Sequence, residues 1–312
     1  MAAVSFTKVE PGLIAILERY VAGEISAPIT LMQLLIETEN VDRVRAALSE
    51  MGQTLSVEQT ATLNELLIAN EAGCERIAAM LRADIDSPRP ARSVEEGIAF
   101  CERLFDWSVQ QSEEASVALY SLGNPELLEK ATAEIVAQLS DWGAVKPEIT
   151  VLDIGCGIGR MLIALAPLVR QAIGIDLSAK MVDAARRRCA NLPNVAVIKG
   201  DGRGLSGVEN SSCDVAIAVD SFPYLRQSGY ELVDAFFAES ARVVKPGGQL
   251  IILNYSYSEN DDADVVEVRE LADRHRFEVL EAATRPFEMW DGVAFRLARL
   301  TSPSSGGQLV SD

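Results

Sequence analysis

Hydrophobic and polar positions follow two different periods along this chain, and the change falls near residue 149. Before it, apolar residues recur at spacings of three and four, which is typical of amphipathic helices. Ser56 followed by Gln59 indicates a capping box, and Pro11 and Pro28 stand where a helix can begin but not continue. We therefore expect helices over 11–23, 28–51 and 56–84.

The stretch DSPRPARS, residues 86–93, carries two prolines between polar side chains and is typical of a linker, so we place a domain boundary near it. Helical periodicity resumes over 94–120 and, after a Gly-Asn-Pro break, over 122–143.

From residue 149 short runs rich in β-branched residues alternate with amphipathic segments, a pattern that favours βαβ units. Several runs are apolar at every position, which indicates strands buried on both faces of a parallel sheet. The expected strands are 149–155, 171–178, 194–201, 213–221 and 247–256. The expected helices between and after them are 160–170, 179–190, 230–247 and 262–276.

Two further β-rich runs, 277–287 and 292–300, flank a Trp-Asp-Gly turn and predict a terminal antiparallel hairpin. The composition of residues 302–312 is typical of a disordered tail. The fold class predicted is α/β: a doubly wound, mostly parallel seven-stranded sheet with an antiparallel terminal hairpin, preceded by an all-α N-terminal domain.

The net charge of the chain limits the classes of molecule that we expect it to bind. With 46 acidic and 28 basic residues the formal charge is −18, which repels phosphate backbones and anionic membrane surfaces. The N-terminus lacks a basic stretch followed by an apolar run, and no apolar run reaches the roughly 18 residues that a membrane span needs. We expect a soluble, cytoplasmic protein with no nucleic-acid or membrane partner.

Cysteine and histidine are too sparse for a disulfide framework or a Cys/His metal site. The five cysteines are scattered and His275 is the only histidine. A mechanism that needs two histidines is thereby excluded, and we expect His275, on a charged helical segment, to be a surface or capping residue. No metal is predicted.

The strongest motif is VLDIGCGIGR, residues 151–160, in which a strand meets three glycines and then a helix that begins near Arg160. Glycines let the backbone turn sharply and approach a ligand closely, and the helix N-terminus offers free N–H groups. A dinucleotide fingerprint, G-x-G-x-x-G, would need a small residue at position 160. The arginine there disfavours a nicotinamide cofactor.

Asp153 to Gly159 resembles the first signature of the class I S-adenosylmethionine-dependent methyltransferases. The resemblance covers roughly residues 120–300 and implies S-adenosyl-L-methionine as cofactor. It implies that this segment contacts the cofactor through Asp153, Gly155, Cys156, Gly157, Gly159 and Arg160.

Asp176 lies at the end of the next expected strand, 23 residues after Asp153. An acidic side chain there can accept hydrogen bonds from both hydroxyls of a ribose, although a mere helix cap would also use such a residue. Ser178 is a natural N-cap for the following helix. By similarity to the family, Leu177 and Met181 lie near the adenosine.

Asp201 and Gly202 follow the third expected strand. The resemblance implies that the carboxylate holds the adenine amino group and that the Gly202 N–H reads a ring nitrogen. Taken alone, Gly-Asp-Gly is also an ordinary turn.

The fourth expected strand ends in Asp220 and Ser221, which the resemblance places beside the transferred methyl group and its acceptor. For the acceptor pocket we expect Phe222, Tyr224, Asn254 and Tyr255, with Tyr257 near the same edge. Core packing is the alternative for both Phe222 and Tyr224. The sequence DSFPY lacks the paired prolines of enzymes that methylate nucleic-acid bases. Tyr120 is expected to cover the sulfonium by a cation–π contact, or else to be an interior tyrosine.

These features predict a methyltransferase that acts on the oxygen, nitrogen or carbon of a small molecule and releases S-adenosylhomocysteine. Two alternatives stay open: an intramolecular cyclisation that releases methylthioadenosine, and a non-catalytic sensor. No catalytic residue is assigned, since aligned methyl transfer does not require a base; Asp220, Tyr224 and Tyr255 are candidates. The expected domains are a helical cap or homodimerisation domain over 1–86, a linker and cofactor lid over 87–148, and the methyltransferase domain over 149–301.

Overall fold

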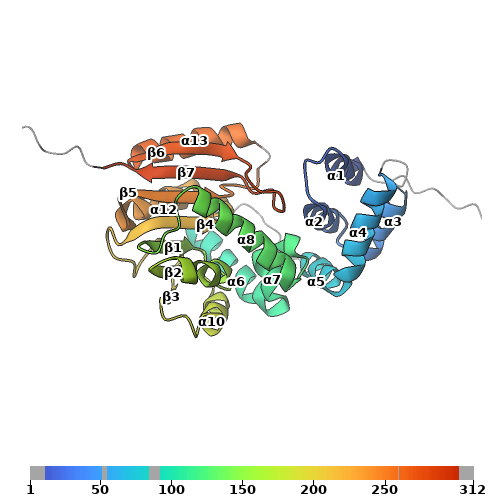
Figure 1. The fold of residues 1–312 in the computed structure, drawn as a ribbon, viewed down its shortest axis with the longest axis horizontal. Helices are drawn as coiled ribbons and strands as arrows, with labels where there is room; N and C mark the ends of the chain where they lie inside the picture. The colour runs from blue at the N-terminus through green and yellow to red at the C-terminus, as the bar shows by residue number, and fades with distance from the viewer. Residues whose placement is uncertain (1–10, 51–54, 84–91, 259, 302–312) are drawn as a thin grey trace, which may run out of the picture. The chain divides into compact units, whose positions relative to one another are not determined.

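The computed structural model describes residues 11–50, 55–83, 92–258 and 260–301. These residues form two compact units (Figure 1). The first takes its described residues from 1–89, 102–138 and 286–292, and the second from 90–101, 139–285 and 293–312. Most of the expected linker, 86–93, and the expected tail, 302–312, lie outside the described residues.

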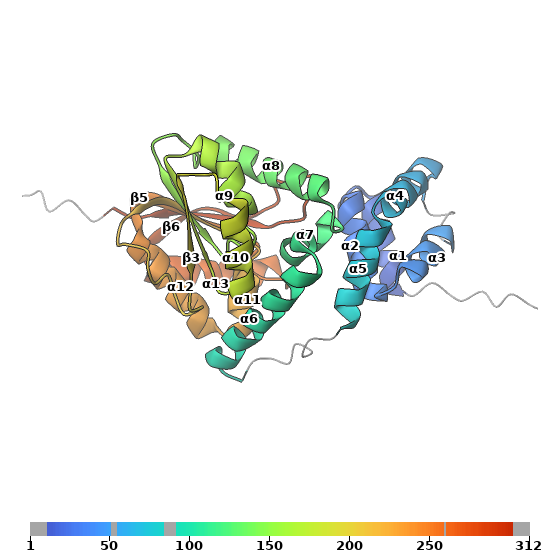
Figure 2. The ribbon, with the colours of Figure 1, turned by 90° about the horizontal axis from the view of Figure 1, so that it is seen from below.

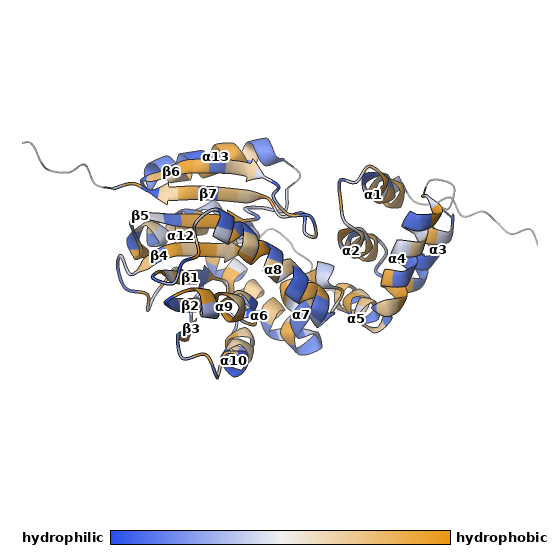
Figure 3. Cartoon of the chain, viewed as in Figure 1, coloured by the Kyte–Doolittle hydropathy of each residue, from blue (hydrophilic) through white to orange (hydrophobic). Residues whose placement is uncertain are grey.

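The helices that precede the sheet bury the apolar stripes seen in the sequence. They are α1 (Pro11–Val21), α2 (Ala27–Thr38), α3 (Val41–Glu50), α4 (Val57–Ala69), α5 (Glu71–Arg82), α6 (Val94–Gln111), α7 (Glu113–Val117), the 3-10 turn η1 (Leu119–Ser121) and α8 (Pro125–Asp141). The core of the first unit is built from apolar side chains of α1 to α5, and leucines are the most frequent residue in it. Helix α2 is coloured as hydrophobic over much of its length in Figure 3 and contributes three fully buried leucines.

Two of the helices that periodicity predicts in this region are each divided into two shorter helices. The expected 28–51 helix is two helices, because Glu39 adopts a left-handed φ of 50° and the Asn40 side chain accepts from the Arg43 N–H. The expected 56–84 helix likewise breaks at Asn70. The capping box between Ser56 and Gln59 is present.

One segment of the first unit lies far along the chain from the helices that form the rest of the unit. Residues 286–292, which connect the last two strands, are held by the helices α2 and α8. The Ser26 hydroxyl donates to the Met289 carbonyl at 2.8 Å. The Glu134 carboxylate accepts from the backbone N–H groups of Glu288 and Met289 at 2.6 and 3.2 Å. The loop is therefore an integral part of the helical unit.

The second unit is built on a seven-stranded sheet in the order β3-β2-β1-β4-β5-β7-β6. Its strands are β1 (Thr150–Ile154), β2 (Gln171–Asp176), β3 (Val195–Lys199), β4 (Cys213–Val219), β5 (Val244–Leu253), β6 (Phe277–Thr284) and β7 (Ala294–Arg299). The first five run parallel, and β7 pairs antiparallel with both β5 and β6. The predicted doubly wound sheet with an antiparallel terminal hairpin is confirmed.

The strand order determines which face each helix covers. The crossovers from β1 to β2 and from β4 to β5 run in opposite directions, so right-handed connections place their helices on opposite faces. Figure 2 shows α9 and α10 on one face and α12 and α13 on the other. The elements concerned are α9 (Arg160–Leu165), the 3-10 turn η2 (Ala166–Leu168), α10 (Ala179–Arg188), α11 (Phe222–Ser228), α12 (Tyr230–Val243) and α13 (Asp261–Arg274). None of the described helices has the length and apolar character that would let it cross a membrane.

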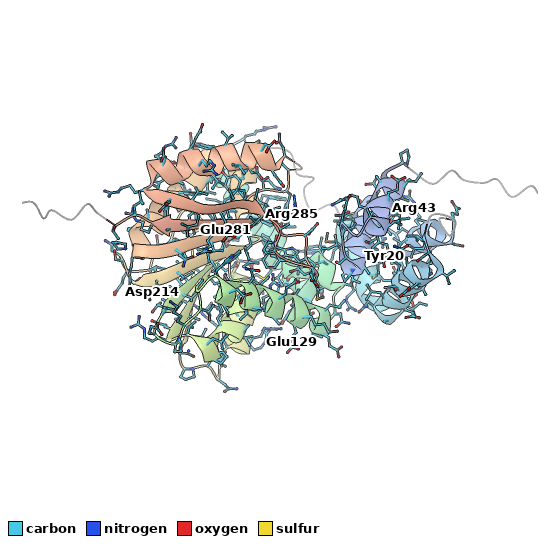
Figure 4. The ribbon with its side chains drawn as sticks, turned by 45° about the horizontal axis from the view of Figure 1, so that its top comes forward. Tyr20, Arg43, Glu129, Asp214, Glu281 and Arg285 are labelled. Carbon is cyan, nitrogen blue, oxygen red and sulfur yellow. The ribbon has the colours of Figure 1, made fainter. Side chains whose placement is uncertain are left out.

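Burial follows position in the sheet. The central strand β1 is buried at every residue, whereas β3, although largely apolar, is only partly covered because it lies at the edge of the sheet. At the amino end of the sheet, Asp214 of β4 accepts from the Thr150 N–H of β1 at 2.8 Å and from Lys245 of β5 at 2.7 Å (Figure 4). These two bonds join three neighbouring strands at the amino end of the sheet. The carboxyl ends of the strands, where open α/β sheets bind ligands, lie at the opposite edge.

Candidate functional site

The loop after β1 turns through three left-handed glycines. Gly155, Gly157 and Gly159 have φ values of 76°, 53° and 80°, which residues with a side chain rarely adopt. A Cβ on Gly155 would lie 2.6 Å from the Cβ of Ser221, so the loop packs directly against the segment after β4. Helix α9 begins at Arg160, as expected. The glycines thus bring two neighbouring strand ends into contact.

Asp176, at the end of β2, is fixed by backbone donors. Its Oδ2 accepts from the Gly157 N–H and its Oδ1 from the Ser178 N–H, both at 2.8 Å. A carboxylate has about four lone-pair sites, so these bonds are compatible with further bonds to the vicinal hydroxyls of a ribose. Ser178 caps α10 by accepting from the Met181 N–H at 3.0 Å, which places the buried Met181 in the first turn behind the carboxylate.

Asp153 is a buried carboxylate beneath the glycine loop. It is 2% exposed, and its Oδ2 has no hydrogen-bond partner. Burial raises the pKa of Asp153 to about 7; the cation of Arg160 opposes the rise and the charge of Asp176 adds to it. A buried acceptor with no donor is the place for a ligand N–H, and the acidic surroundings favour a cationic one.

The adjoining side chains line the neighbouring strand ends. Gly202 has a φ of 76°, and a Cβ there would lie 3.0 Å from side-chain atoms of Leu177 and Ile98. Asp201 is exposed and accepts from the Arg203 N–H at 2.9 Å. Cys156 is buried against Gly174 of β2, and burial raises the pKa of its thiol. The parallel pairing of β2 and β3 places Asp176 and Asp201 at the same edge of the sheet.

A second polar group lies after β4 and β5. The Asp220 Oδ1 accepts from the Asn254 amide at 2.6 Å and from the Tyr257 hydroxyl at 3.4 Å. Tyr224 and Tyr257 meet edge to face with their ring centroids 6.0 Å apart. Burial raises the pKa of Tyr224 to about 12, and the charge of Asp220 adds to the effect. Tyr224 is therefore a neutral hydrogen-bonding group at physiological pH.

Backbone strain coincides with this second group. Asp220 and Asn254 have φ values of 57° and 64°, a conformation that few non-glycine residues adopt outside turns and functional sites. The Asn254 position is fixed by Val293, whose N–H donates to the amide oxygen and whose carbonyl accepts from the Asn254 N–H, both at 2.8 Å. Two strand ends thus present preorganised polar side chains.

The other expected residues lie elsewhere. Phe222 begins α11, so the chain turns into a helix directly after Ser221. Phe222 and Tyr255 are buried in the core with their ring centroids 6.1 Å apart, so their position fits packing. Tyr120 belongs to the helical unit, where its ring lies 6.0 Å from that of Trp290. Its contact with a sulfonium stays a prediction, as does substrate binding by Phe222 and Tyr255.

Sequence reasoning missed the residues behind Tyr257. Ser256 and Ser258 form a hydrogen-bond group around the buried Asp264, and nothing in their order along the chain marks it except the alternation Ser-Tyr-Ser. His275 ends α13 and bonds Asp234 at 2.8 Å, away from the groups described above, which agrees with a capping role.

Comparison with known proteins agrees with this geometry. Residues 151–248 match the family model described as a methyltransferase domain. The chain is 29% identical over 150 residues to an S-adenosyl-L-methionine-dependent Diels-Alderase of Talaromyces variabilis, covering 45% of this chain and 48% of that protein. It is 33% identical over 121 residues to the demethylmenaquinone methyltransferase of Staphylococcus aureus, covering 38% and 47%.

Among solved structures, the phosphoethanolamine N-methyltransferase 1 of Haemonchus contortus, in complex with phosphoethanolamine and S-adenosylhomocysteine, shares the fold with a TM-score of 0.54 and 17% identity. That match covers 70% of this chain and 52% of the other. The chain spans between about a third and a half of the length of the curated relatives it matches. Residues 151–248 therefore carry a methyltransferase domain, and the strand order and the glycine loop agree with the class I S-adenosylmethionine-dependent methyltransferases.

Proposed function

We propose that this protein transfers the methyl group of S-adenosylmethionine to an oxygen, nitrogen or carbon atom of a small molecule and releases S-adenosylhomocysteine. The observation that carries the proposal is the contact between Gly155 and Ser221, which joins the glycine loop to the segment that bears Asp220. Strands β1 and β4 are parallel neighbours, so both groups lie at one sheet edge, where open α/β sheets bind ligands.

The residues present fit the cofactor. Asp176 is held so that its carboxylate can bind the ribose hydroxyls, and the unpartnered oxygen of Asp153 suits the amino group of the methionyl arm. When bound, S-adenosylmethionine supplies an electrophilic methyl group on a positively charged sulfur. The neighbouring carboxylates complement that charge.

Asp220 and its partners are suited to the acceptor. As the acceptor atom forms its bond to carbon, the electrons of the sulfur–carbon bond return to sulfur, and a proton on the acceptor must leave. The carboxylate of Asp220 can orient that proton and receive it, while Asn254 and Tyr257 hold the carboxylate in place. Tyr224 stays protonated and therefore orients the acceptor without acting as a base.

The small-molecule class rests on charge and on relatives. A net charge of −18 disfavours nucleic acid, and curated relatives carry the names of menaquinone and sterol methyltransferases. A second candidate is a ring-forming activity in which the cofactor is bound without being consumed, favoured by the similarity to a Diels-Alderase.

The roles of the other regions are proposals that stand beside the main one. We propose residues 1–86 as a cap or a homodimerisation element, residues 87–148 as the lid segment with Tyr120, and 149–301 as the catalytic domain in the cytoplasm. Light scattering of the full chain tests dimerisation, since a monomer at micromolar concentration would contradict it.

The main test is mass spectrometry of the full chain incubated with methyl-deuterated S-adenosylmethionine and a small-metabolite extract. S-adenosylhomocysteine that forms only with extract, together with a labelled product, supports methyl transfer. Methylthioadenosine formed from the cofactor alone would instead indicate cyclisation of its amino-acid arm. A new product with intact cofactor would indicate the ring-forming reaction, and a cofactor that binds without any product would indicate a sensor.

A further inference from the structure

The segment after β5 is fixed by a carboxylate that lies outside the site described above. Asp264, in the first turn of α13, is 4% exposed. Its Oδ2 accepts from the Ser256 hydroxyl at 2.6 Å, and its Oδ1 from the Ser258 hydroxyl at 3.4 Å. The Ser256 hydroxyl oxygen in turn accepts from the Ser258 N–H at 3.0 Å. The two serine hydroxyl oxygens lie 2.7 Å apart, so the buried carboxylate holds Ser256 directly and holds Ser258 both through a long bond of its own and through the Ser256 hydroxyl.

Tyr257 stands between these two serines. The chain bends at Tyr257, and its hydroxyl reaches Asp220 while the hydroxyls of Ser256 and Ser258 reach Asp264. Its ring is about half exposed, with 54% of its surface open, and its hydroxyl donates to Asp220 at 3.4 Å. The direction of Tyr257 follows from the anchoring of its neighbours.

Two further contacts hold the helix that carries Asp264. The Asn260 side chain caps α13 by accepting from the Ala263 N–H at 3.1 Å, so the turn that carries Asp264 is held at its start. Arg226 of α11 binds Glu267, one turn further along α13, at 2.7 Å, and so ties the helix to the helix that bears Tyr224. Burial of a carboxylate lowers the stability of the fold unless the carboxylate is hydrogen bonded. The bonds from the two serine hydroxyls offset this cost for Asp264.

We infer that Asp264 is a positioning residue for methyl transfer: through Ser256 and Ser258 it holds Tyr257 against Asp220, at the acceptor side of the site. This inference rests on the proposed function. Misplacement of a reacting group by about 1 Å can reduce a rate on the order of a hundredfold, so loss of the anchor should appear in turnover.

The first experiment needs no turnover. Hydrogen–deuterium exchange of the full chain is compared among wild type, Asp264→Asn and the matched control Asp262→Asn, an exposed aspartate on the same helix. Asp264→Asn should raise exchange over residues 254–258 and the control should not. The double variant Ser256→Ala with Ser258→Ala, which keeps α13 intact, should repeat the effect. Unchanged exchange in both anchor variants would overturn the inference.

The second experiment is a double-mutant cycle with Tyr257→Phe, using the initial rate of S-adenosylhomocysteine formation over a dilution series of the small-metabolite extract. We expect Asp264→Asn to lower the rate about tenfold in the wild-type background and less than about twofold in the Tyr257→Phe background. Affinity for S-adenosylhomocysteine should change by less than about twofold, whereas a general loss of structure would reduce it.

An equal loss in both backgrounds would show that Asp264 does not act through Tyr257 and would overturn the inference. Absence of turnover in the wild type would refute the proposed function instead, and the exchange comparison would still decide whether Asp264 fixes the segment.

Discussion

Replacing Asp153 with asparagine should make the apoprotein more stable at alkaline pH and weaken its hold on the cofactor. The pKa of Asp153 is about 7 in the folded chain and 3.8 in its unfolded reference state. The folded protein therefore binds the proton more tightly, and ionisation of this carboxyl opposes folding. The opposition is absent well below pH 3.8, grows as the pH rises and is complete above pH 7.

The magnitude follows from linkage. A difference of about 3 pKa units, at 1.36 kcal/mol each, corresponds to about 4 kcal/mol at full ionisation. Between pH 5 and pH 8 the change is about 3 kcal/mol, because part of the cost is already present at pH 5. Asparagine has nearly the same shape and carries no charge. The stability gained by Asp153→Asn should thus be about 3 kcal/mol larger at pH 8 than at pH 5.

The assay is thermal unfolding of wild type and variant at both pH values, with Asp183→Asn, an exposed aspartate on α10, as the control. In a domain of this size about 3 kcal/mol corresponds to roughly 6 to 12 °C in melting temperature. A gain that does not depend on pH, or a loss of stability at pH 8, would refute the reasoning.

The substitution Asp153→Asn should weaken ligand binding, although it stabilises the apoprotein. A cationic amino group beside Asp153 favours the ionised carboxyl, so the affinity of wild type for S-adenosylhomocysteine should rise with pH up to about pH 7 and then level off. Asp153→Asn should bind on the order of tenfold more weakly and without this pH dependence. Calorimetric titration between pH 5.5 and 8 measures both effects, and a flat wild-type profile would show that no cation of the ligand meets Asp153.

Three further changes test separate parts of the molecule. Asp176→Ala should weaken binding of S-adenosylhomocysteine about 10- to 100-fold, since hydrogen bonds to a charged acceptor contribute about 1.5 to 3 kcal/mol; unchanged calorimetric affinity would contradict the ribose assignment. Gly155→Ala should lower the free energy of unfolding by roughly 2 to 4 kcal/mol through its left-handed φ and its overlap with Ser221, and Ser221→Gly should restore only the overlap part in chemical denaturation. Glu134→Gln should increase hydrogen exchange over residues 286–292 by weakening a charge-assisted pair of bonds, whereas the exposed Glu129→Gln (Figure 4) should leave that exchange unchanged.

The sheet could be predicted because its strands are dictated locally. The run Thr150–Ile154 is buried at every position and is apolar apart from Thr150 and Asp153. The left-handed φ of Gly155 is indicated by the glycine itself. Helix ends were harder. Periodicity over 56–84 continues across Asn70, and only its buried contacts show that the chain breaks there.

The proposed cofactor half and the proposed acceptor half of the site differ in how the sequence encodes their geometry. The proposed cofactor half depends on the backbone: three left-handed glycines and the N–H groups of Gly157 and Ser178, all within 25 residues after Asp153. The acceptor half depends on side chains from separate elements. Asp220 is held by Asn254 from the following strand, and Asn254 is held by the backbone of Val293.

No spacing rule connects those positions, because they come together only in the assembled sheet, in which β7 lies between β5 and β6. The arrangement of the strands in the sheet also decides whether an aromatic side chain that follows a strand points towards the ligand site or into the core. Tyr255 and Tyr257 are two residues apart in sequence, yet the first is 1% exposed and the second 54%. The bond of Tyr257 to Asp220, and the carboxylate of Asp264 behind it, therefore had to come from the structure. Acceptor choice in this chain should accordingly respond to substitutions around Asp220, Asn254 and Tyr257 that leave the cofactor half unchanged.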